Sequence, residues 1–122
     1  MKALAEFTIW SLPPTVNNLY GRLPRTVYKK SEVREWQIET ISSMRKEWGA
    51  KPAIKTLLEL RIEFTSRTHR KWDVDNRIKP LQDCLERAGV IKNDAQIWRV
   101  EAERKIGSCD STWVQVVEYH ER

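Results

Sequence analysis

The segment Leu58–Thr65 reads Leu-Glu-Leu-Arg-Ile-Glu-Phe-Thr, so that apolar and polar side chains alternate at every step. Successive side chains of a β-strand point to opposite faces, and this period of two therefore predicts a strand with one face buried. It is the clearest strand in the sequence. The segments on either side of it are expected to complete one sheet with helices packed on it.

Before this strand, an apolar stripe with near-helical spacing predicts an amphipathic helix. The helix is expected to begin at Ser31, a residue type that caps helix N-termini, and to stop at Gly49. Residues 15–30 show no sustained period and contain turn-forming residues, so they are expected to form a long loop, which in a small domain is often functional. Residues 5–12 alternate in the manner of a short strand, which the following pair of prolines ends. The apolar stripe consists of Val33, Trp36, Ile41, Met44 and Trp48.

After the clear strand, a helix is predicted over residues 76–88, with Gly89 as its stop. Pro80 complicates the start of this helix because proline is tolerated only in the first turn. Either the regular helix begins near Pro80, or residues 76–79 form an irregular turn that leads into it.

The last quarter of the chain contains two more alternating segments, at residues 98–106 and 113–119, with a turn near residues 107–111. They are expected to pair with each other as a closing hairpin. The resulting order, β-α-β-α-β-β, predicts an α+β fold in which two helices pack on a mixed sheet of about four strands. The length of 122 residues suits a single domain spanning residues 1–122.

Composition narrows the classes of partner. The formal net charge of +5 favours a polyanion, because neutralising phosphates releases condensed counterions, although charge alone does not identify the partner. No run approaches the roughly 20 apolar residues that span a membrane, and the N-terminus lacks the apolar core of a signal peptide, so a cytoplasmic protein without membrane contact is expected. Cys84 and Cys109 show neither CxxC spacing nor a nearby pair of histidines, and they are expected to be reduced and structural.

The segment most informative about chemistry is Trp72–Pro80, which reads Trp-Asp-Val-Asp-Asn-Arg-Ile-Lys-Pro. In an extended chain residues i and i+2 point to the same side, so Asp73 and Asp75 are expected to converge on one hard cation. Mg²⁺ or Mn²⁺, which take oxygen ligands, are the usual reason to keep two carboxylates together. Asp94 is a candidate third ligand, because the intervening helix would carry the chain away and return it to the sheet.

Structural alternatives remain open for these side chains. The aspartates could belong to a solvated turn in which Asp75 or Asn76 caps the following helix. Lys79 suits a phosphate contact or the stabilisation of transition-state charge, but equally a surface ion pair with Asp83 at i+4. The basic neighbourhood favours phosphodiester cleavage, in which a metal activates water while cations hold the backbone. Its members are Arg67, His69, Arg70, Lys71 and Lys79.

The string Asp-Val-Asp-Asn-Arg-Ile-Lys-Pro-Leu-Gln-Asp-Cys-Leu at Asp73–Leu85, followed by Gly89–Ile91 and Asn93–Ile97, resembles the RusA family of Holliday junction resolvases. The likeness covers most of the chain in the right order. Its N-terminal part, similar to that family's opening loop, consists of Pro13, Pro14, Asn17, Asn18 and Tyr20.

The resemblance implies a site in which three aspartates bind the catalytic Mg²⁺ or Mn²⁺ beside a functional lysine. Asn76 fills a position for which the resemblance suggests a structural or substrate-positioning role. Trp72 stands where a basic residue can be found in relatives, and Asn93 where a further aspartate can be found, so both could alter substrate fit or metal affinity. The implied ligands and lysine are Asp73, Asp75, Asp94 and Lys79.

The implied function is that of a Mg²⁺-dependent, structure-selective endonuclease that resolves Holliday junctions by paired symmetric cuts during DNA recombination and repair, and such proteins are often encoded by phages or prophages. A C₂ homodimer follows, because the four-way junction needs two nicks and one small chain supplies one site. Two alternatives stay open: a metal-dependent nuclease that acts on other branched DNA or on RNA, and a non-catalytic DNA-binding protein of the same fold.

Contacts with DNA are expected from two parts of the sequence. Residues 20–30 mix basic and aromatic side chains, which suits phosphates and unstacked bases, although an ordinary solvated loop is the alternative. Trp72, beside the aspartates, could stack on an exposed base. The complete expected set is Asn17, Asn18, Tyr20, Arg22, Arg25, Lys29, Lys30, Arg67, Arg70, Lys71, Trp72, Asn76 and Lys79.

Overall fold

The computed structural model describes residues 2–14 and 25–122, and for residues 25–30 the description is of the backbone. The described residues form a mixed four-stranded sheet with two α-helices, which confirms the predicted α+β fold. The elements are β1 (Ala5–Ile9), α1 (Arg25–Trp48), β2 (Leu58–Ser66), the 3₁₀ turn η2 (Asp75–Arg77), α2 (Ile78–Arg87), the 3₁₀ turn η3 (Asp94–Gln96), β3 (Ile97–Ile106) and β4 (Ser111–Glu118).

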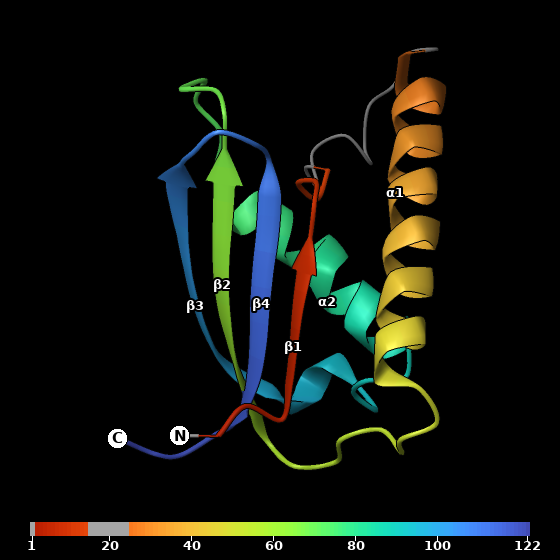
Figure 1. Ribbon diagram of the computed structural model, residues 1–122, viewed down its shortest axis with the longest axis vertical. Coiled ribbons are helices and arrows are strands. Elements are labelled where there is room, and N and C mark those ends of the chain that lie inside the picture. The colour runs from red at the N-terminus through yellow and green to blue at the C-terminus, as the bar shows by residue number, and fades with distance from the viewer. Residues whose placement is uncertain (1, 15–24) are drawn as a thin grey trace.

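The strands lie in the order β1-β4-β2-β3 across the sheet (Figure 1). β2 runs parallel to β3 and antiparallel to β4, and β4 runs antiparallel to β1. The predicted hairpin of the last two strands is therefore wrong, because β2 lies between them. The connection from β2 through α2 returns the chain parallel to β2, as a βαβ crossover does, so β3 takes the place beside β2 and β4 inserts on the other side.

The turn between β3 and β4 must consequently pass over the end of β2. Gly107 makes this crossing, and its backbone N–H donates to the carbonyl of Ser66 at 3.0 Å. A Cβ atom at Gly107 would lie 2.5 Å from Cγ2 of Thr65, so glycine is required for the close approach. The crossing brings the turn at residues 107–110 next to the loop that follows β2.

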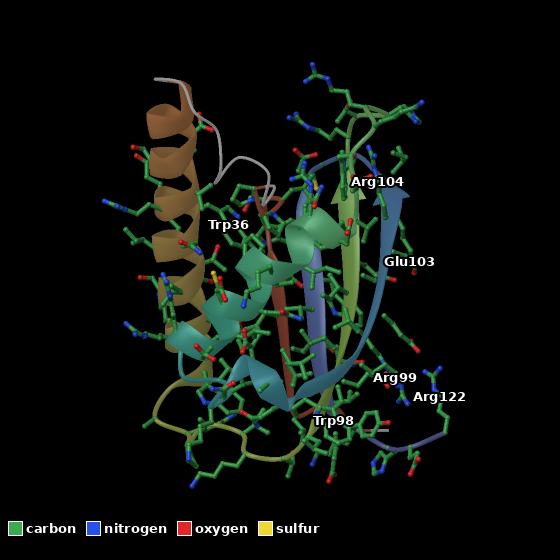
Figure 2. The ribbon with its side chains drawn as sticks, turned by 180° about the vertical axis from the view of Figure 1, so that it is seen from behind. Trp36, Trp98, Arg99, Glu103, Arg104 and Arg122 are labelled. Atoms are coloured by element: carbon green, nitrogen blue, oxygen red, sulfur yellow. The ribbon has the colours of Figure 1, made fainter. Side chains whose placement is uncertain are left out.

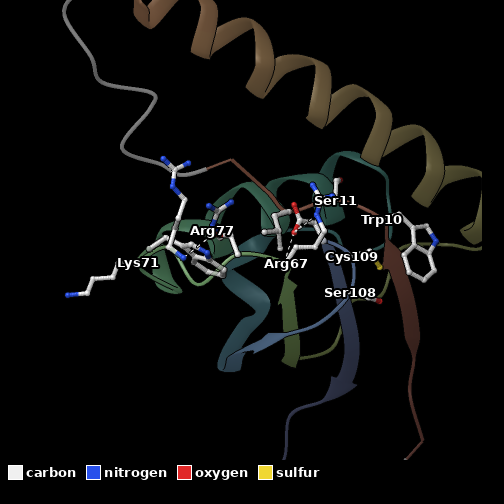
Figure 3. Close-up of a pocket in the computed structure, with 12 residues that line it drawn as sticks. Trp10, Ser11, Arg67, Lys71, Arg77, Ser108 and Cys109 are labelled. Atoms are coloured by element: carbon white, nitrogen blue, oxygen red, sulfur yellow. Dashed lines mark hydrogen bonds and ion pairs between the residues drawn. The ribbon is translucent and has the colours of Figure 1, made fainter.

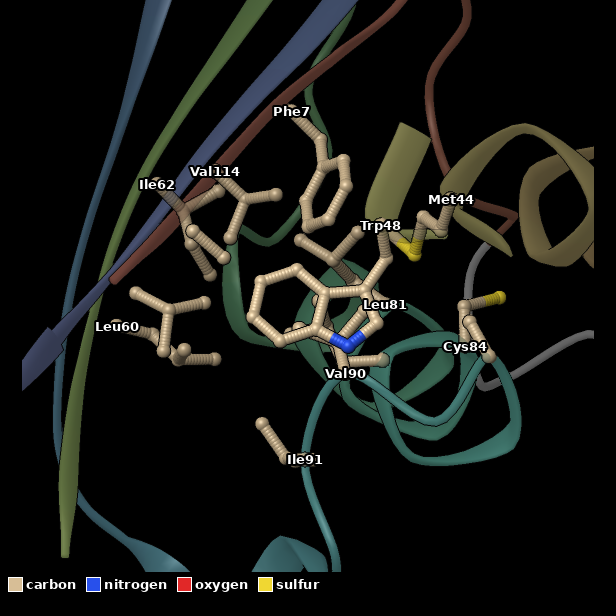
Figure 4. Packing of buried hydrophobic residues seen from close by; sticks show 14 of the residues in the cluster. Phe7, Met44, Trp48, Leu60, Ile62, Leu81, Cys84, Val90, Ile91 and Val114 are labelled. Carbon is tan, nitrogen blue, oxygen red and sulfur yellow. The ribbon is translucent and has the colours of Figure 1, made fainter. Parts of the chain in front are cut away.

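Both helices cover the same face of the sheet, with α1 beside the β1 edge (Figure 1). The apolar side chains of β2 point into this layer, and they are at most 2% exposed. They meet side chains from both helices in one core (Figure 4). Core members from the three elements include Leu58, Leu60, Ile62 and Phe64 of β2, Met44 and Trp48 of α1, and Leu81 and Leu85 of α2.

The N-terminal end of α1 differs from the prediction. The helix begins at Arg25, six residues before the expected cap, so that Ser31 lies inside it and residues 25–30 are helical instead of loop. The reason is that no glycine or proline follows Pro24 until Gly49, and nothing in the sequence interrupts helix propagation. The predicted stop is confirmed, since Gly49 directly follows the helix with φ of +70°.

The start of α2 follows the second of the two predicted arrangements. An irregular turn, η2, leads into the helix, and Pro80 is the third residue of α2, where its missing N–H interrupts no helical hydrogen bond. The predicted stop at Gly89 is also confirmed, with φ of +79°. In the described part of the chain, neither helix is both long and apolar enough to cross a membrane.

Candidate active site

The loop after β2 carries basic side chains, and one side chain of β3 holds it in place. Nη1 of Arg104 donates to the carbonyl of Arg70 at 2.7 Å, while Nη2 donates to the Ser66 hydroxyl at 3.0 Å and to the Thr68 carbonyl at 2.6 Å. The carboxylate of Asp110, in the β3–β4 turn, accepts from the backbone N–H of Arg67 at 2.9 Å. The loop is thus tied both to the neighbouring strand and to the turn that crosses it.

Trp72 lies at the end of this loop and is half-buried against two guanidinium groups. The guanidinium carbons of Arg77 and Arg104 each lie 4.3 Å from the centroid of the indole ring. Phe64 meets the ring edge-on, with centroids 5.8 Å apart. Where relatives can carry one basic residue, this chain therefore carries an aromatic ring that gathers two cations. These contacts occupy the ring that was expected to stack on a base.

Arg77 supports the N-terminal segment as well as the indole. Its Nη1 donates to the carbonyl of Pro13. Burial lowers the pKa of Arg77, and the nearby charge of Arg104 lowers it further. Three buried N–H groups of this cluster, those of Trp72 Nε1, Arg77 Nε and Arg104 Nε, have no acceptor among the described residues. The cluster is therefore rich in hydrogen-bond donors.

The extended backbone from which Asp73 and Asp75 were expected to converge on one cation is not found. Val74, between them, has φ of −59° and ψ of −44°, so the chain already turns in the helical sense at this residue. The physical reason is the half-buried side chain of Val74, which packs against the core and starts the turn early. Nδ2 of Asn76 instead donates to Oδ2 of Asp73 at 3.4 Å.

The alternative in which one of these side chains caps a helix is also not found. Neither η2, preceded by Val74, nor α2, preceded by Arg77, has a side-chain hydrogen bond at its N-cap. Asp73 and Asp75 are both exposed. Two carboxylates thus stand at the surface beside the basic loop without a capping role.

Lys79 joins the first turn of α2 to Asp94 in η3. Its Nζ donates to Oδ2 of Asp94 at 2.6 Å and lies 3.1 Å from Oδ1 of Asp83. The hydrogen bond with Asp94 and then that with Asp83 raise the pKa of Lys79. The surface pair with Asp83 therefore exists, and Asp94 lies beside the first turn of α2. Its expected place next to Asp73 and Asp75 as a third ligand stays a prediction.

The backbone of η3 holds Asp94 in this position. The carboxylate of Glu86 accepts from the backbone N–H of Asp94 at 2.8 Å. Asn93 caps η3, since its side chain accepts from the N–H of Ala95 at 2.7 Å, and Gln96 completes a capping box. Asparagine and aspartate cap equally well, which gives a physical account of Asn93 where a further aspartate can occur.

The three aspartates have the chemistry of a hard-cation site but not, in this structure, its geometry. Carboxylate oxygens are the ligands that Mg²⁺ and Mn²⁺ take. Among residues 2–14 and 31–122, however, no three or more His, Cys, Asp or Glu side chains gather closely enough to hold a metal ion. Of the expected ligands, Asp94 is held by the ammonium group of Lys79.

An open cavity of about 1010 Å³ adjoins the aspartate segment, residues 73–75, which it meets at Trp72. Its walls come from three places that are distant in sequence, together with Arg77 (Figure 3). These places are residues 10–12, residues 67–68 with 70–72, and residues 108–110. Four of the side chains expected to contact DNA line it, Trp72 among them. The cations on its walls are Arg67, Arg70, Lys71 and Arg77.

The other residues expected to contact DNA lie outside this cavity or outside the described residues. Asn76 and Lys79 lie on η2 and α2, beside the aspartates. Asn17, Asn18, Tyr20 and Arg22 lie outside the described residues. The remaining three lie on the first turns of α1 instead of on a loop, and their side chains are outside the description; they are Arg25, Lys29 and Lys30.

Comparison with known proteins gives this geometry its context. A family model described as endodeoxyribonuclease RusA matches residues 11–117. The chain belongs to the RusA family. Members of this family are endodeoxyribonucleases, which cut phosphodiester bonds within DNA. The RusA-family match contains the basic loop, the aspartates, Lys79 and all the cations of the cavity.

A curated relative supports the same assignment. The chain is 35% identical, over 103 residues, to the crossover junction endodeoxyribonuclease RusA of Aquifex aeolicus (strain VF5). The similarity extends over 83% of this chain and 80% of the relative. The similarity to this relative is therefore spread over about four-fifths of both proteins.

Proposed function

We propose that this RusA-family chain, acting as one domain over residues 1–122, resolves Holliday junctions by cutting phosphodiester bonds at the branch during DNA recombination and repair. The observation that carries the proposal is the position of the cation-lined cavity, which meets the aspartate segment at Trp72. A duplex arm seated on the cations would place its backbone beside Asp73 and Asp75. The name of the Aquifex relative supports a junction as the substrate.

Hydrolysis is assigned to the carboxylates together with a divalent cation. Asp73, Asp75 and Asp94 are proposed to hold Mg²⁺ or Mn²⁺, because their oxygens suit a hard ion and the family resemblance assigns them this role. Since the three carboxylates are not gathered in this structure, they would have to close on the ion when it binds. When bound, such a cation polarises the phosphoryl oxygen and activates water as the nucleophile.

Lys79 is proposed to stabilise negative charge that develops on the phosphate. An ammonium group directed at a phosphoryl oxygen is worth most where charge accumulates in the transition state. Lys79 is half-exposed and is placed by its contacts with Asp94 and Asp83. It can therefore reach a phosphate without leaving its helix.

Two such chains are proposed to act as a C₂ homodimer. A four-way junction has two-fold symmetry, and its resolution requires one nick in each of two opposite strands. Each chain supplies one set of Asp73, Asp75, Asp94 and Lys79, so the paired nicks need two copies.

Incubation with Mg²⁺ and a mobile four-way junction tests the proposal, with flap, linear duplex and single-stranded DNA as controls. Paired symmetric nicks on the junction are the expected result. Equal or preferential cutting of the flap would replace the junction by another branched DNA, and junction binding without any cutting would favour the non-catalytic alternative. Sedimentation equilibrium under the same conditions tests the dimer.

A further inference from the structure

Trp10 is the most exposed large apolar side chain among the described residues, at 75% exposure. It follows the last residue of β1 and lies on the wall of the cation-lined cavity. We propose that Trp10 and the cations of this cavity form a binding site for one unstacked nucleotide of the branched DNA, with the base on the indole ring and its phosphate on the basic loop. The inference deepens the proposed function and rests on it.

The backbone that presents Trp10 is held before it by the pairing of β1 with β4, which reaches Ile9, and after it by contacts of Ser11 and Pro13. The Ser11 hydroxyl accepts from Nε1 of Trp36 on α1 at 2.9 Å, and the Ser11 carbonyl accepts from the hydroxyl of Thr112 on β4 at 2.8 Å. Two residues further along, the Pro13 carbonyl accepts from Arg77. An exposed indole ring on a held backbone offers a flat apolar surface, which is what base stacking needs.

The rest of the cavity supplies what the phosphate needs. Figure 3 shows Lys71 at one end of the cavity and Trp10 at the other, beside Ser108 and Cys109. Four cationic side chains line the walls against the single carboxylate of Asp110, which already accepts from the backbone of Arg67. The surplus of positive charge and of N–H donors favours an anionic occupant.

The size and openness of the cavity agree with a nucleotide. Its volume, about 1010 Å³, lies at the upper end of the roughly 300–1,000 Å³ found for sites that bind small molecules. Since the cavity meets the aspartate segment at Trp72, a nucleotide held there belongs to a strand that passes the cutting site. At a branch point base stacking is interrupted, so the cost of withdrawing a base from the stack is lowest there. The cavity therefore selects the branch over a continuous duplex.

Equilibrium binding in EDTA, where Mg²⁺-dependent cutting does not compete, tests this site. The Trp10→Ala variant is expected to bind a four-way junction about tenfold more weakly, and Trp10→Phe to recover most of the loss, because a phenyl ring also stacks. Binding to linear duplex should change less than twofold. Trp98→Ala is the matched control, since that indole is 62% exposed but lies at the opposite end of β3 from Arg104 (Figure 2).

A double-mutant cycle identifies the nucleotide. Junctions that carry an abasic site at each position around the branch are compared for the wild-type protein and for Trp10→Ala. One abasic position should cost the wild type about tenfold and the variant almost nothing, because the same stacking contact is removed twice.

Full additivity at every position, or equal affinities for Trp10→Ala and Trp98→Ala, would overturn the inference. Its failure is distinguishable from failure of the proposed function. If wild-type protein still nicks the junction in Mg²⁺ while Trp10→Ala binds normally, the nuclease proposal stands and the nucleotide site falls.

Discussion

Nζ of Lys79 lies 2.6 Å from Oδ2 of Asp94, a residue fifteen positions further along the chain. The contact closes α2 and η3 into one unit, so that a residue following the crossover helix faces a residue in its first turn. Asp94 is one of the aspartates expected to bind metal. If a cation neutralised its carboxylate, the ammonium group of Lys79 would lose this partner and could take another position.

Lys79→Ala should reduce turnover more than binding. If Lys79 stabilises charge that develops only in the transition state, its removal lowers kcat by about 10²-fold while junction affinity changes little. Single-turnover cutting and equilibrium binding measure the two effects separately. Lys46→Ala, on the exposed surface of α1, is the control for loss of one charge. An unchanged rate would return Lys79 to an ordinary ion pair with Asp83.

Asp75→Asn should abolish cutting and leave junction binding intact or tighter. In the proposed site, the substitution would remove an oxygen ligand and a negative charge near the phosphates, while the size of the side chain is kept. Gel-shift and cutting assays on the same preparation check both parts. Glu118→Gln removes an exposed charge at the end of β4 and should leave both unchanged. Cutting by the Asp75 variant at the wild-type rate would exclude this residue from the site.

Arg104→Ala should weaken junction binding although Arg104 need not touch DNA. The loss of its three hydrogen bonds to residues 66–70 leaves the basic loop poorly positioned, and we expect about tenfold weaker binding and a free energy of unfolding lower by about 1–3 kcal/mol. Arg122→Ala, which removes an exposed arginine paired with Glu101, is the matched control. Equal affinities for the two variants would show that the loop does not depend on Arg104.

Glu59 should make stability depend on pH in the acidic range. Its carboxylate, with a side chain 4% exposed, contacts Arg99 at 2.8 Å and Arg61 at 2.7 Å. The hydrogen bond from Arg99 lowers the pKa of Glu59 below its ordinary 4.5, against the opposing effect of burial. The ion pairs of the Glu59 carboxylate therefore stabilise the fold above pH 4.5. Their contribution is lost as the pH falls through the lower pKa that Glu59 has in the folded state.

Glu59→Gln tests this dependence by urea unfolding at several pH values. At neutral pH we expect the free energy of unfolding to fall by about 1–3 kcal/mol. The difference from wild type should shrink progressively as the pH is lowered below the ordinary glutamate pKa. A difference that is the same at all pH values would mean that the Gln side chain disturbs packing and that the ionised carboxylate is not the cause.

The two thiols should differ in reactivity. Cys84 is buried in the core, which raises its pKa to about 12, whereas Cys109 is exposed on the wall of the cavity. One thiol should react with a maleimide in the native protein and two after denaturation. Because the adduct occupies the cavity, it should also weaken junction binding, and Cys109→Ser should be insensitive to the reagent. Retention of full affinity by the modified protein would argue against this route for DNA.

Local signals were sufficient for much of the fold. The alternation at Leu58–Thr65 placed β2 to within one residue, because burial of one face repeats at every second position. Gly49 and Gly89 marked both helix ends, since each takes a positive φ. The pairing of strands was not predictable in this way, because β3 and β4 alternate alike and the choice of neighbour is decided by the crossover through α2.

Contacts between residues that are distant in the sequence also explain which features of the site were not predicted. Arg104 acts only because β3 lies beside β2, and the hairpin prediction placed it elsewhere. The turn at Val74 depends on the packing of its side chain against the core, which the spacing of Asp73 and Asp75 in the sequence does not reveal. Trp10 looks like any core tryptophan until its exposure is known. Asp73, Asp75 and Lys79 could be singled out from the sequence because they stand in one contiguous stretch, and their roles stay predictions.

The position of β4 also constrains synthesis of the protein on the ribosome. β1 is translated first, yet among the described strands it pairs with β4 alone, which is translated last. β1 must therefore wait until residues 111–118 have been synthesised before it can join the sheet. A nascent chain that stops before residue 108 lacks residues 108–110 of the cavity wall and also Thr112, which holds Ser11, so the affinity proposed for this site is acquired only after β4 has been made.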